Sequence, residues 1–293
     1  MQQKSSIIFI IPYFGQWPFW MPFFIESCRW NKDINWLLLG DCAELTGLPQ
    51  NVMHRRISFS DYCAFISSRL GFSFAPERAY KLCDLKPALG FIHANDVAGY
   101  DYWGFSDLDL IYGDLRSYFT EEKLARYDFF STHERRVAGH LCVMRNERKW
   151  TELFMRIPKY QVRVQDARNH ALDEGAFTRL FLWRKNFPLP LFNFLGLFNP
   201  LRRRAQFEEV YSTPNASRAW TDGSMNFPSH WHWQDGNLYT SSDGLRKFPY
   251  FHFYAWKRCW ARSQTSTEAE LRSLAASHNW RIDEAGFHFW GGK

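Results

Sequence analysis

Residues 100–114 read YDYWGFSDLDLIYGD, and within them an aromatic run passes directly into two aspartates separated by one residue. The run at 100–104 predicts a β-strand. Because side chains alternate along an extended chain, Asp107 and Asp109 should point to the same side. At the carboxyl edge of an α/β sheet, both would lie in the crevice where ligands bind. The stretch therefore predicts a ligand site at the end of a strand.

The rest of the first half alternates between predicted strands and helices. The predicted strands are 7–11, 36–39 and 52–57, and the predicted helices are 19–30 and 77–93. Pro87 must kink or divide the second helix, because proline removes a backbone donor. This alternation indicates an α/β fold with a mainly parallel sheet flanked by helices.

The second half is less regular. The predicted strands are 129–132 and 141–145, and the predicted helices are 147–156, 174–185 and 267–278. Residues 215–244 are dense in Asn, Ser, Asp, Gly and Trp, which predicts loop or irregular strand. We expect the C-terminal part to be an irregular extension of the α/β domain.

Composition and charge narrow the class of protein. Of the 293 residues, 46% are hydrophobic and 19% aromatic, which excludes a disordered chain and supplies a large core. The net charge of +6 suits an anionic partner, whether a nucleotide diphosphate, an anionic lipid or a nucleic acid. Nucleic acid is the least favoured of the three, because the basic residues are dispersed and no recognised binding module is present.

The cysteines and apolar runs bear on the compartment. Six Cys occur without a CxxC pair or a tight cluster, so neither a zinc site nor a disulfide framework is indicated. The apolar run at 7–11 is too short for a signal peptide, and no run is long enough to span a bilayer. We therefore expect a cytoplasmic protein, which can still bind peripherally to the inner face of the cytoplasmic membrane.

The paired aspartates predict a divalent-metal site. Two like charges held together repel each other unless a cation or proton joins them, and Mn²⁺ or Mg²⁺ favours such oxygen ligands. The metal can bridge the two phosphates of a nucleotide sugar and neutralise the leaving diphosphate. An isolated Asp-x-Asp triplet also marks ordinary turns. Here its position after an apolar strand and before Gly113 and Asp114 favours a metal site.

The Asp-x-Asp strand resembles that of glycosyltransferases with the GT-A fold. The longer string resembles a bacterial family associated with polysaccharide and lipopolysaccharide loci. The motifs that carry the second resemblance are Pro12-Tyr13-Phe14-Gly15, the string YKLCDLKP at 80–87, Gly139-His140-Leu141, Arg145-Asn146 and the aromatic-flanked His252. It spans about residues 7–257, and it implies a GT-A-like (Rossmann-like) catalytic domain over 1–260. Its donor-binding half would be about 1–115 and its acceptor-binding half 116–260, with a helical or irregular extension at 261–293.

The resemblance implies roles on the donor side of the site. The residues implied to meet the nucleotide sugar are Pro12, Tyr13, Gly15, Lys81, Asp84, Lys86 and Asp107. Lysine suits phosphate as a point charge, and Asp can hold a ribose or sugar hydroxyl. The alternative for the first three is a plain strand-to-helix turn. For Lys81, Asp84 and Lys86 it is a solvated helix face.

The resemblance also implies a histidine that completes the metal shell. GT-A enzymes commonly use one near the C-terminal end, and His252 matches best, with His230 and His232 as rivals in the same region. Imidazole suits Mn²⁺ better than Mg²⁺. His232, and more weakly His140, are candidates for the acceptor site. A histidine among aromatic residues can equally be a satisfied core residue.

The acidic pair Asp173-Glu174 is the candidate catalytic base. The resemblance implies that it is the counterpart of an acceptor-side acid, which would take the proton of the acceptor hydroxyl. A base is needed only if the reaction inverts the configuration of the sugar. The alternative role is helix capping, since acidic residues favour the first turn of a helix.

These features together predict a metal-dependent glycosyltransferase that moves a sugar from a nucleotide-sugar donor. The acceptor would be a glycan or lipid-linked saccharide in surface polysaccharide or lipopolysaccharide synthesis. The basic, aromatic segment 181–204 could rest on anionic lipid near such an acceptor, or it could be a buried connection.

Two other functional classes remain open. In phosphoryl-transfer enzymes of the haloacid-dehalogenase type, the first Asp of an Asp-x-Asp loop is the nucleophile. That loop normally lies near the chain start, whereas Asp107 follows three predicted strands, and the residues after Leu110 are large. A non-catalytic glycan-binding protein would use Trp and Tyr surfaces instead, and it would bind glycan without any nucleotide.

Overall fold

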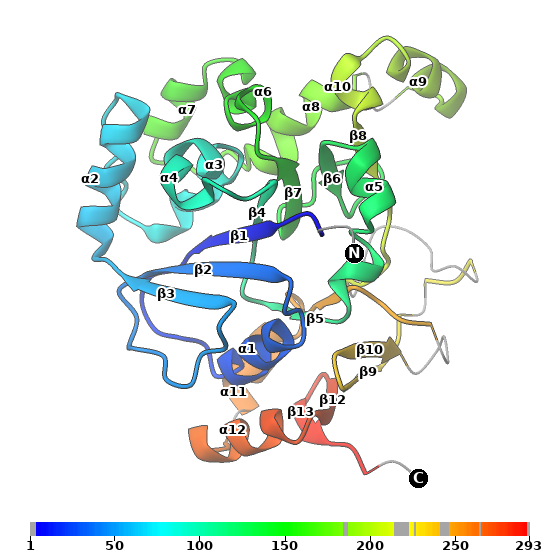
Figure 1. Ribbon diagram of the computed structural model, residues 1–293. Helices are drawn as coiled ribbons and strands as arrows, with labels where there is room; N and C mark the ends of the chain where they lie inside the picture. The colour runs from blue at the N-terminus through cyan, green and yellow to red at the C-terminus, as the bar shows by residue number, and fades with distance from the viewer. Residues whose placement is uncertain are drawn as a thin grey trace.

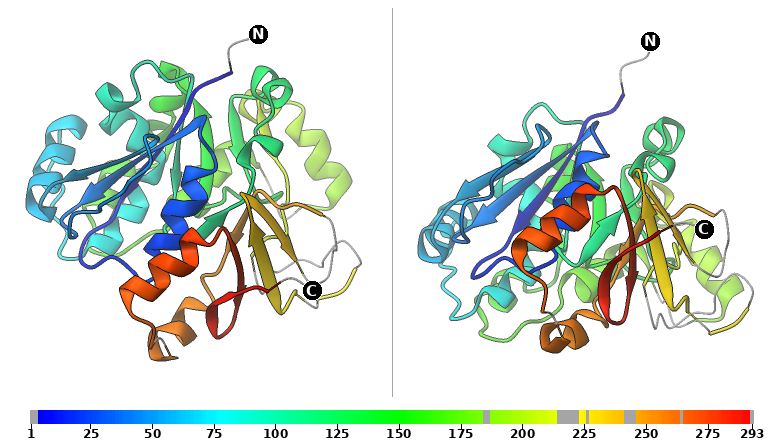
Figure 2. Two further views of the ribbon diagram at one scale, coloured as in Figure 1. Left: turned by 60° about the horizontal axis from the view of Figure 1, so that its bottom comes forward. Right: turned by 90° about the horizontal axis from the view of Figure 1, so that it is seen from below.

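The computed structural model describes residues 4–183, 187–213, 223–225, 227–240, 246–263 and 265–291. A seven-stranded sheet forms its centre, with helices on both faces, and a smaller sheet lies beside the C-terminal helices (Figures 1 and 2). The order of the central strands is β3 (Val52–Arg56), β2 (Ile34–Gly40), β1 (Ile7–Pro12), β4 (Tyr102–Ser106), β7 (Leu141–Arg145), β6 (Phe129–Ser131) and β8 (Ala205–Phe207).

Most neighbours in the central sheet run parallel, and only β7 runs antiparallel to the strands on either side of it. The predicted fold, a mainly parallel sheet flanked by helices, is confirmed.

The helices are α1 (Met21–Arg29), α2 (Phe59–Leu70), α3 (Leu89–Ile92), α4 (Ala94–Val97), α5 (Glu121–Arg126), α6 (Arg148–Thr151), α7 (Tyr160–Gln165), α8 (Thr178–Phe181), α9 (Leu189–Gly196), α10 (Pro200–Arg203), α11 (Lys257–Ser263) and α12 (Glu268–Ala276). The 3-10 helices are η1 (Ala79–Ala88), η2 (Leu115–Ser117) and η3 (Leu153–Arg156), and η4 (Asp173–Phe177) is a π-helix.

Strand β1 shows why the sheet is covered on both faces. Its residues 7–11 are all buried, as expected for a central parallel strand. Ile8 and Ile10 pack in one apolar cluster, whereas Ile7, Phe9 and Ile11 pack in another on the opposite face. Because side chains alternate along the strand, β1 contributes to both apolar clusters, one on each face of the sheet.

The helix predicted at 77–93 is wound differently from an α-helix. Residues 79–88 form the 3-10 helix η1, which contains Pro87, and α3 and α4 follow it. The predicted strand at 100–104 begins two residues later, as β4. The end of the predicted helix at Lys185 lies outside the described residues, as do 215–222, 226 and 241–244 of the segment predicted to be loop or irregular strand.

Part of the segment 215–244, predicted to be loop or irregular strand, forms regular strands. A four-stranded antiparallel sheet runs in the order β10 (Asn237–Thr240), β9 (His230–Gln234), β12 (Asn279–Asp283) and β13 (Gly286–Phe289). Trp233 of β9 stacks on Trp280 of β12 with ring centroids 4.5 Å apart. The strands of the 261–293 extension, which the sequence did not predict, thus share a sheet with 230–240. Stacking between aromatic rings of distant segments stabilises these strands, and composition alone does not reveal such contacts.

A two-stranded pairing links the central sheet to the C-terminal part. Strand β5 (Leu110–Tyr112) pairs antiparallel with β11 (Tyr250–His252), and Leu110 lies opposite His252. Beyond it, the amide of Gly113 donates to the carbonyl of Pro249 at 2.9 Å. No helix among the described residues is both long and apolar enough to cross a bilayer.

The close approach at Gly113 gives a test of this pairing. A Cβ at this position would lie 2.2 Å from the carbonyl oxygen of Phe248. We expect Gly113→Ala to lower the free energy of unfolding by about 1–3 kcal/mol, because the two backbones must separate. Urea denaturation measures the change. The matched control is Gly175→Ala, whose Cβ would have its nearest contact at 3.8 Å and should cost little; equal effects of both changes would contradict the reading.

Candidate functional site

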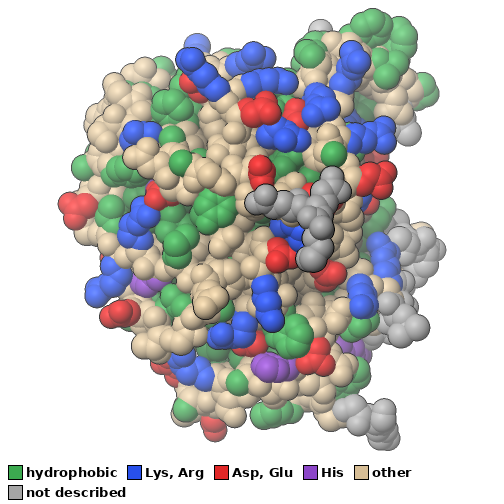
Figure 3. All heavy atoms as spheres, viewed as in Figure 1, with side chains coloured by type: hydrophobic (Ala, Val, Ile, Leu, Met, Phe, Trp, Pro, Cys, Tyr) green, Lys and Arg blue, Asp and Glu red, His purple; other side chains and the backbone are tan. Residues whose placement is uncertain are grey.

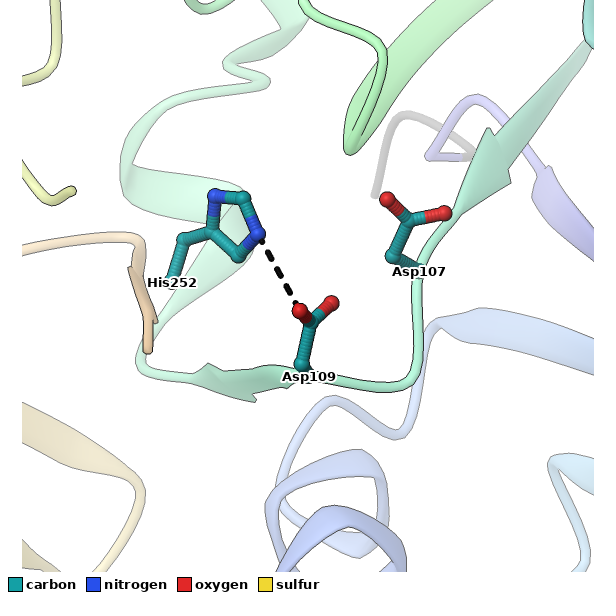
Figure 4. A group of neighbouring side chains, drawn as sticks. All are labelled: Asp107, Asp109 and His252. Atoms are coloured by element: carbon teal, nitrogen blue, oxygen red, sulfur yellow. Dashed lines mark ion pairs between the residues drawn. The ribbon is translucent and has the colours of Figure 1, made fainter. Parts of the chain in front are cut away.

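Asp107, Asp109 and His252 meet at one point in the structure. The two aspartates lie between β4 and β5, and the histidine ends β11. One ligand atom from each lies within 4.8 Å of the other two. Figure 4 shows the imidazole of His252 and the carboxylate of Asp109 directed toward each other, with Asp107 beside them. The site thus combines two carboxylates and one imidazole, a donor set that suits Mn²⁺.

Asp109 is held as an anion by two basic neighbours. Its Oδ2 lies 3.4 Å from Nε2 of His252 and accepts a 2.6 Å hydrogen bond from Nζ of Lys257. Burial alone would raise the pKa of Asp109, but His252 and Lys257 outweigh it and hold that pKa well below its usual value. The carboxylate is therefore charged at neutral pH and ready to bind a cation.

Contacts with neighbouring side chains fix the orientation of the His252 ring. Its Nδ1 lies 3.4 Å from Oγ1 of Thr213, so the other ring nitrogen faces Asp109. His140 stacks on it with ring centroids 4.2 Å apart, and Nε2 of His140 is bonded to the hydroxyl of Tyr250 at 2.8 Å. Such supporting contacts commonly fix a metal-binding imidazole.

Asp107 is paired with a second lysine. Nζ of Lys86 donates to Oδ1 of Asp107 at 2.6 Å and to the carbonyl of Gly139 at 2.7 Å. It also lies 3.9 Å from Oδ2 of Asp173. Burial would lower the pKa of Lys86, but Asp107 and Asp173 outweigh it and raise that pKa, so the ammonium keeps its charge.

The two aspartates and their lysine partners border a cavity of about 490 Å³. The cavity opens where β1 and β4 end, and its polar lining includes Tyr13, Lys86, Asp107, Asp109 and Lys257. Its size is within the range of small-molecule sites. Two other cavities are somewhat larger, at about 570 and 610 Å³. The two aspartates that line the 490 Å³ cavity and meet His252, rather than its size, mark it as the candidate site.

The predicted donor residues divide between this cavity and other places. Pro12, Tyr13 and Lys86 line it. Gly15 instead lines the 570 Å³ cavity near α1 and α12, and its amide donates to Oδ1 of Asp41 at 2.7 Å. With φ at 110°, Gly15 adopts a conformation that other residues rarely reach.

Lys81 and Asp84 have a structural role that the sequence did not predict. Their side chains form a buried 2.9 Å ion pair, and neither lines the cavity beside Asp107. Nζ of Lys81 also donates to the carbonyls of Arg163 and Arg168, and Asp84 accepts from the amides of residues 170 and 172. The geometry does not support donor binding by this pair, because its charges are used to hold the segment 163–172.

The predicted acceptor histidines do not face the cavity either. His140 is enclosed, and burial lowers its pKa well below the usual value, so it is neutral beside His252. His232 lies on β9, where its ring packs 3.8 Å from that of Trp290. Burial lowers the pKa of His232 to about 4. Neither position supports an acceptor role.

Asp173 and Glu174 differ in their surroundings. Asp173 is buried beside Lys86, and burial raises its pKa to about 6. Glu174 is half-exposed, with Oε2 3.5 Å from Nη1 of Arg136. The N-terminus of η4 has no side-chain cap. Both acids nevertheless lie in the first turn of η4, and Oδ1 of Asp173 accepts from the amide of Glu174 at 2.9 Å, as the alternative role predicts. Asp173 also lies in the same network as Asp107.

Two residues of the cavity were missed by the sequence analysis. Lys257 follows His252 by five residues in the first turn of α11, and only the β5–β11 pairing reveals that it reaches Asp109. Tyr80 is 72% exposed and borders both this cavity and the 610 Å³ one. An exposed aromatic ring at such a rim is a feature that single-sequence patterns do not distinguish from a core aromatic.

Comparison with known sequences places the chain in a family. A family model matches residues 9–281. The chain belongs to the family of unknown function DUF6625. No curated protein matches this DUF6625 chain by sequence.

Solved structures similar to this DUF6625 chain include three transferases. The galactosyltransferase LgtC, in complex with donor and acceptor sugar analogues, aligns at 11% identity over 94% of this chain and 96% of its own, with a TM-score of 0.44. Mouse xyloside xylosyltransferase 1 aligns at 9% identity, covering 85% and 97%, with a TM-score of 0.38. The glycosyltransferase GlyE of Streptococcus pneumoniae aligns at 12% identity, covering 72% and 46%, with a TM-score of 0.34. With all three scores below 0.5, function has to be inferred from the side chains of this chain.

The metal site gives a direct binding prediction. We expect Mn²⁺ to bind the wild-type protein and Asp109→Asn to weaken that binding by more than about 100-fold, because a charged ligand is lost. Calorimetric titration measures the affinity. Asp114→Asn is the matched control, since Asp114 caps η2 and Asn caps equally well. Unchanged Mn²⁺ affinity in Asp109→Asn would refute the assignment.

Proposed function

We propose that this DUF6625 protein is a metal-dependent glycosyltransferase that takes its sugar from a nucleotide-sugar donor. The observation that carries the proposal is the group Asp107, Asp109 and His252. The two aspartates line one cavity together with their partners Lys86 and Lys257, and His252 lies 3.4 Å from Asp109. Two carboxylates with two lysines beside them suit a metal–diphosphate complex, in which each charge finds an opposite partner.

The protein residues would divide the work of binding the donor. Asp107, Asp109 and His252 would hold Mn²⁺ or Mg²⁺, which when bound neutralises charge on the leaving diphosphate. Lys86 and Lys257, now paired with the carboxylates, have ammonium groups that can turn to phosphate oxygens. Tyr13 stacks on Trp17 at 5.6 Å and borders the cavity, where it would meet the base or ribose.

The acceptor would approach from the side of Tyr80. Its exposed ring offers an apolar face to a sugar, and the neighbouring 610 Å³ cavity has polar side chains such as Gln165, Asp166 and Asn169 for hydroxyl groups. We infer a glycan or lipid-linked saccharide of cell-surface polysaccharide or lipopolysaccharide synthesis, in agreement with the resemblance of the motifs. A lipid-linked acceptor would bring the enzyme to the inner face of the cytoplasmic membrane.

A nucleotide screen tests the proposed function. We expect one nucleoside diphosphate to raise the melting temperature by several degrees in the presence of Mn²⁺ and to have little effect with EDTA. A ligand at 100 times its Kd adds about 2.7 kcal/mol of stability. A shift with free glycans and none with nucleotides would replace the transferase by a glycan-binding protein. Hydrolysis of phosphate esters without any nucleotide shift would favour the phosphoryl-transfer alternative.

The acidic pair gives a second prediction, for an inverting reaction. With the donor identified, Asp173→Asn should lower kcat by about 10²–10⁴-fold, the usual contribution of a general base. Glu174→Gln, the matched control, should lower it less than tenfold. A carboxyl whose pKa in the free protein is about 6 is protonated and inactive as a base at lower pH, so log(kcat/KM) should rise with unit slope up to about pH 6 and then level. If both variants keep nearly full activity, no base is used, as in a retaining enzyme.

A further inference from the structure

The segment 183–198 carries a dense group of exposed apolar side chains. Of the fourteen large hydrophobic side chains that are exposed in the described part of the chain, six lie here, with exposed fractions from 36% to 66%. We call them the α9 surface: Trp183, Phe187, Leu191, Phe194, Leu197 and Phe198. Contiguous apolar groups of this kind on a protein surface mark interaction sites.

Helix α9 is attached to the domain by a narrow contact. Among its residues whose side chains are described, only Phe192 is buried, and it belongs to the main core cluster. Phe194 contacts Phe198 one turn on, at 5.2 Å between ring centroids, and both are exposed. Figure 1 shows α9 projecting from one corner of the molecule, and Figure 3 shows hydrophobic side chains gathered at that corner with Lys and Arg next to them.

The chain segment that carries the α9 surface contains charges of one sign only. Residues 175–207 contain six Lys and Arg and no Asp or Glu. Arg204 is paired with Asp128, and Arg202 is half-buried over the ring of Phe207. Arg179 and Arg203 are exposed. A protein partner would usually be met with charges of both signs, whereas apolar side chains on a segment whose only charges are basic match the acyl chains and headgroups of an anionic bilayer.

We propose that the α9 surface binds the surface of an anionic membrane. Its six apolar side chains would enter the boundary between headgroups and acyl chains, and Arg179 and Arg203 would contact lipid phosphates. The proposal stands without the proposed function. It deepens that function, because it would hold the enzyme at the leaflet that carries a lipid-linked acceptor.

Vesicle sedimentation of the full chain tests the proposal, with no metal or nucleotide present. We expect the protein to sediment with phosphatidylcholine vesicles that contain phosphatidylglycerol, and much less with phosphatidylcholine alone. The variant Phe194→Ser/Leu197→Ser/Phe198→Ser should lose at least tenfold of its partitioning. Arg179→Gln/Arg203→Gln should lose the preference for the anionic vesicles, and high salt should do the same to the wild type.

The matched control changes exposed apolar residues elsewhere. Met53, Met155 and Val162 are 43%, 52% and 65% exposed and lie outside the α9 surface, so their simultaneous change to Ser should leave sedimentation unaltered. Unchanged far-ultraviolet dichroism of each variant shows that the fold is retained. Equal sedimentation of the wild type and the α9 variant would overturn the proposal. So would a wild-type dimer that the α9 variant converts to monomer, because the surface would then join two copies of this chain.

Discussion

The candidate site depends on one short antiparallel pairing, that of β5 with β11. It joins residues separated by about 140 positions and sets Leu110 opposite His252, so the imidazole arrives beside Asp109. The amide of Phe253 bonds to the carbonyl of Asp109, and the side chains of Ile111 and Phe251 pack in the aromatic C-terminal cluster. The packing that buries these side chains thus also brings His252 beside the two aspartates. A slip of one residue would turn His252 to the opposite face.

Charge balance explains how two carboxylates remain close in a largely buried place. Each is paired with its own lysine, Asp107 with Lys86 and Asp109 with Lys257, so the repulsion between them is offset from both sides. Asp173 shares Lys86 with Asp107, at the longer distance of 3.9 Å, and burial outweighs this attraction and raises its pKa. The same environment thus lowers the pKa of Asp109 and raises that of Asp173, which can exchange a proton near neutral pH.

The sequence predicted the parts of this arrangement that local patterns encode. Strand β1 and the position of Asp107 and Asp109 after a strand followed from apolar runs and alternation. The meeting with His252 followed only from the family resemblance, since no local pattern joins β11 to β5. Lys257 and the burial of His140 were missed for the same reason. The strands β9 and β12 were missed because the stacking of Trp233 on Trp280 is a contact between distant segments.

The string YKLCDLKP shows how helix type divides one charged motif into two roles. In a 3-10 helix, side chains three residues apart lie above one another. Lys81 and Asp84 therefore meet and turn inward, where they hold the segment 163–172. Lys86 follows Asp84 by two residues, falls on another side of η1 and reaches Asp107. Asp84 also accepts a hydrogen bond from the amide of Leu172, so the Lys81–Asp84 pair fixes the chain next to Asp173. Nζ of Lys86 then lies 3.9 Å from Oδ2 of Asp173. The buried pair thus contributes to the site through the position it gives Asp173.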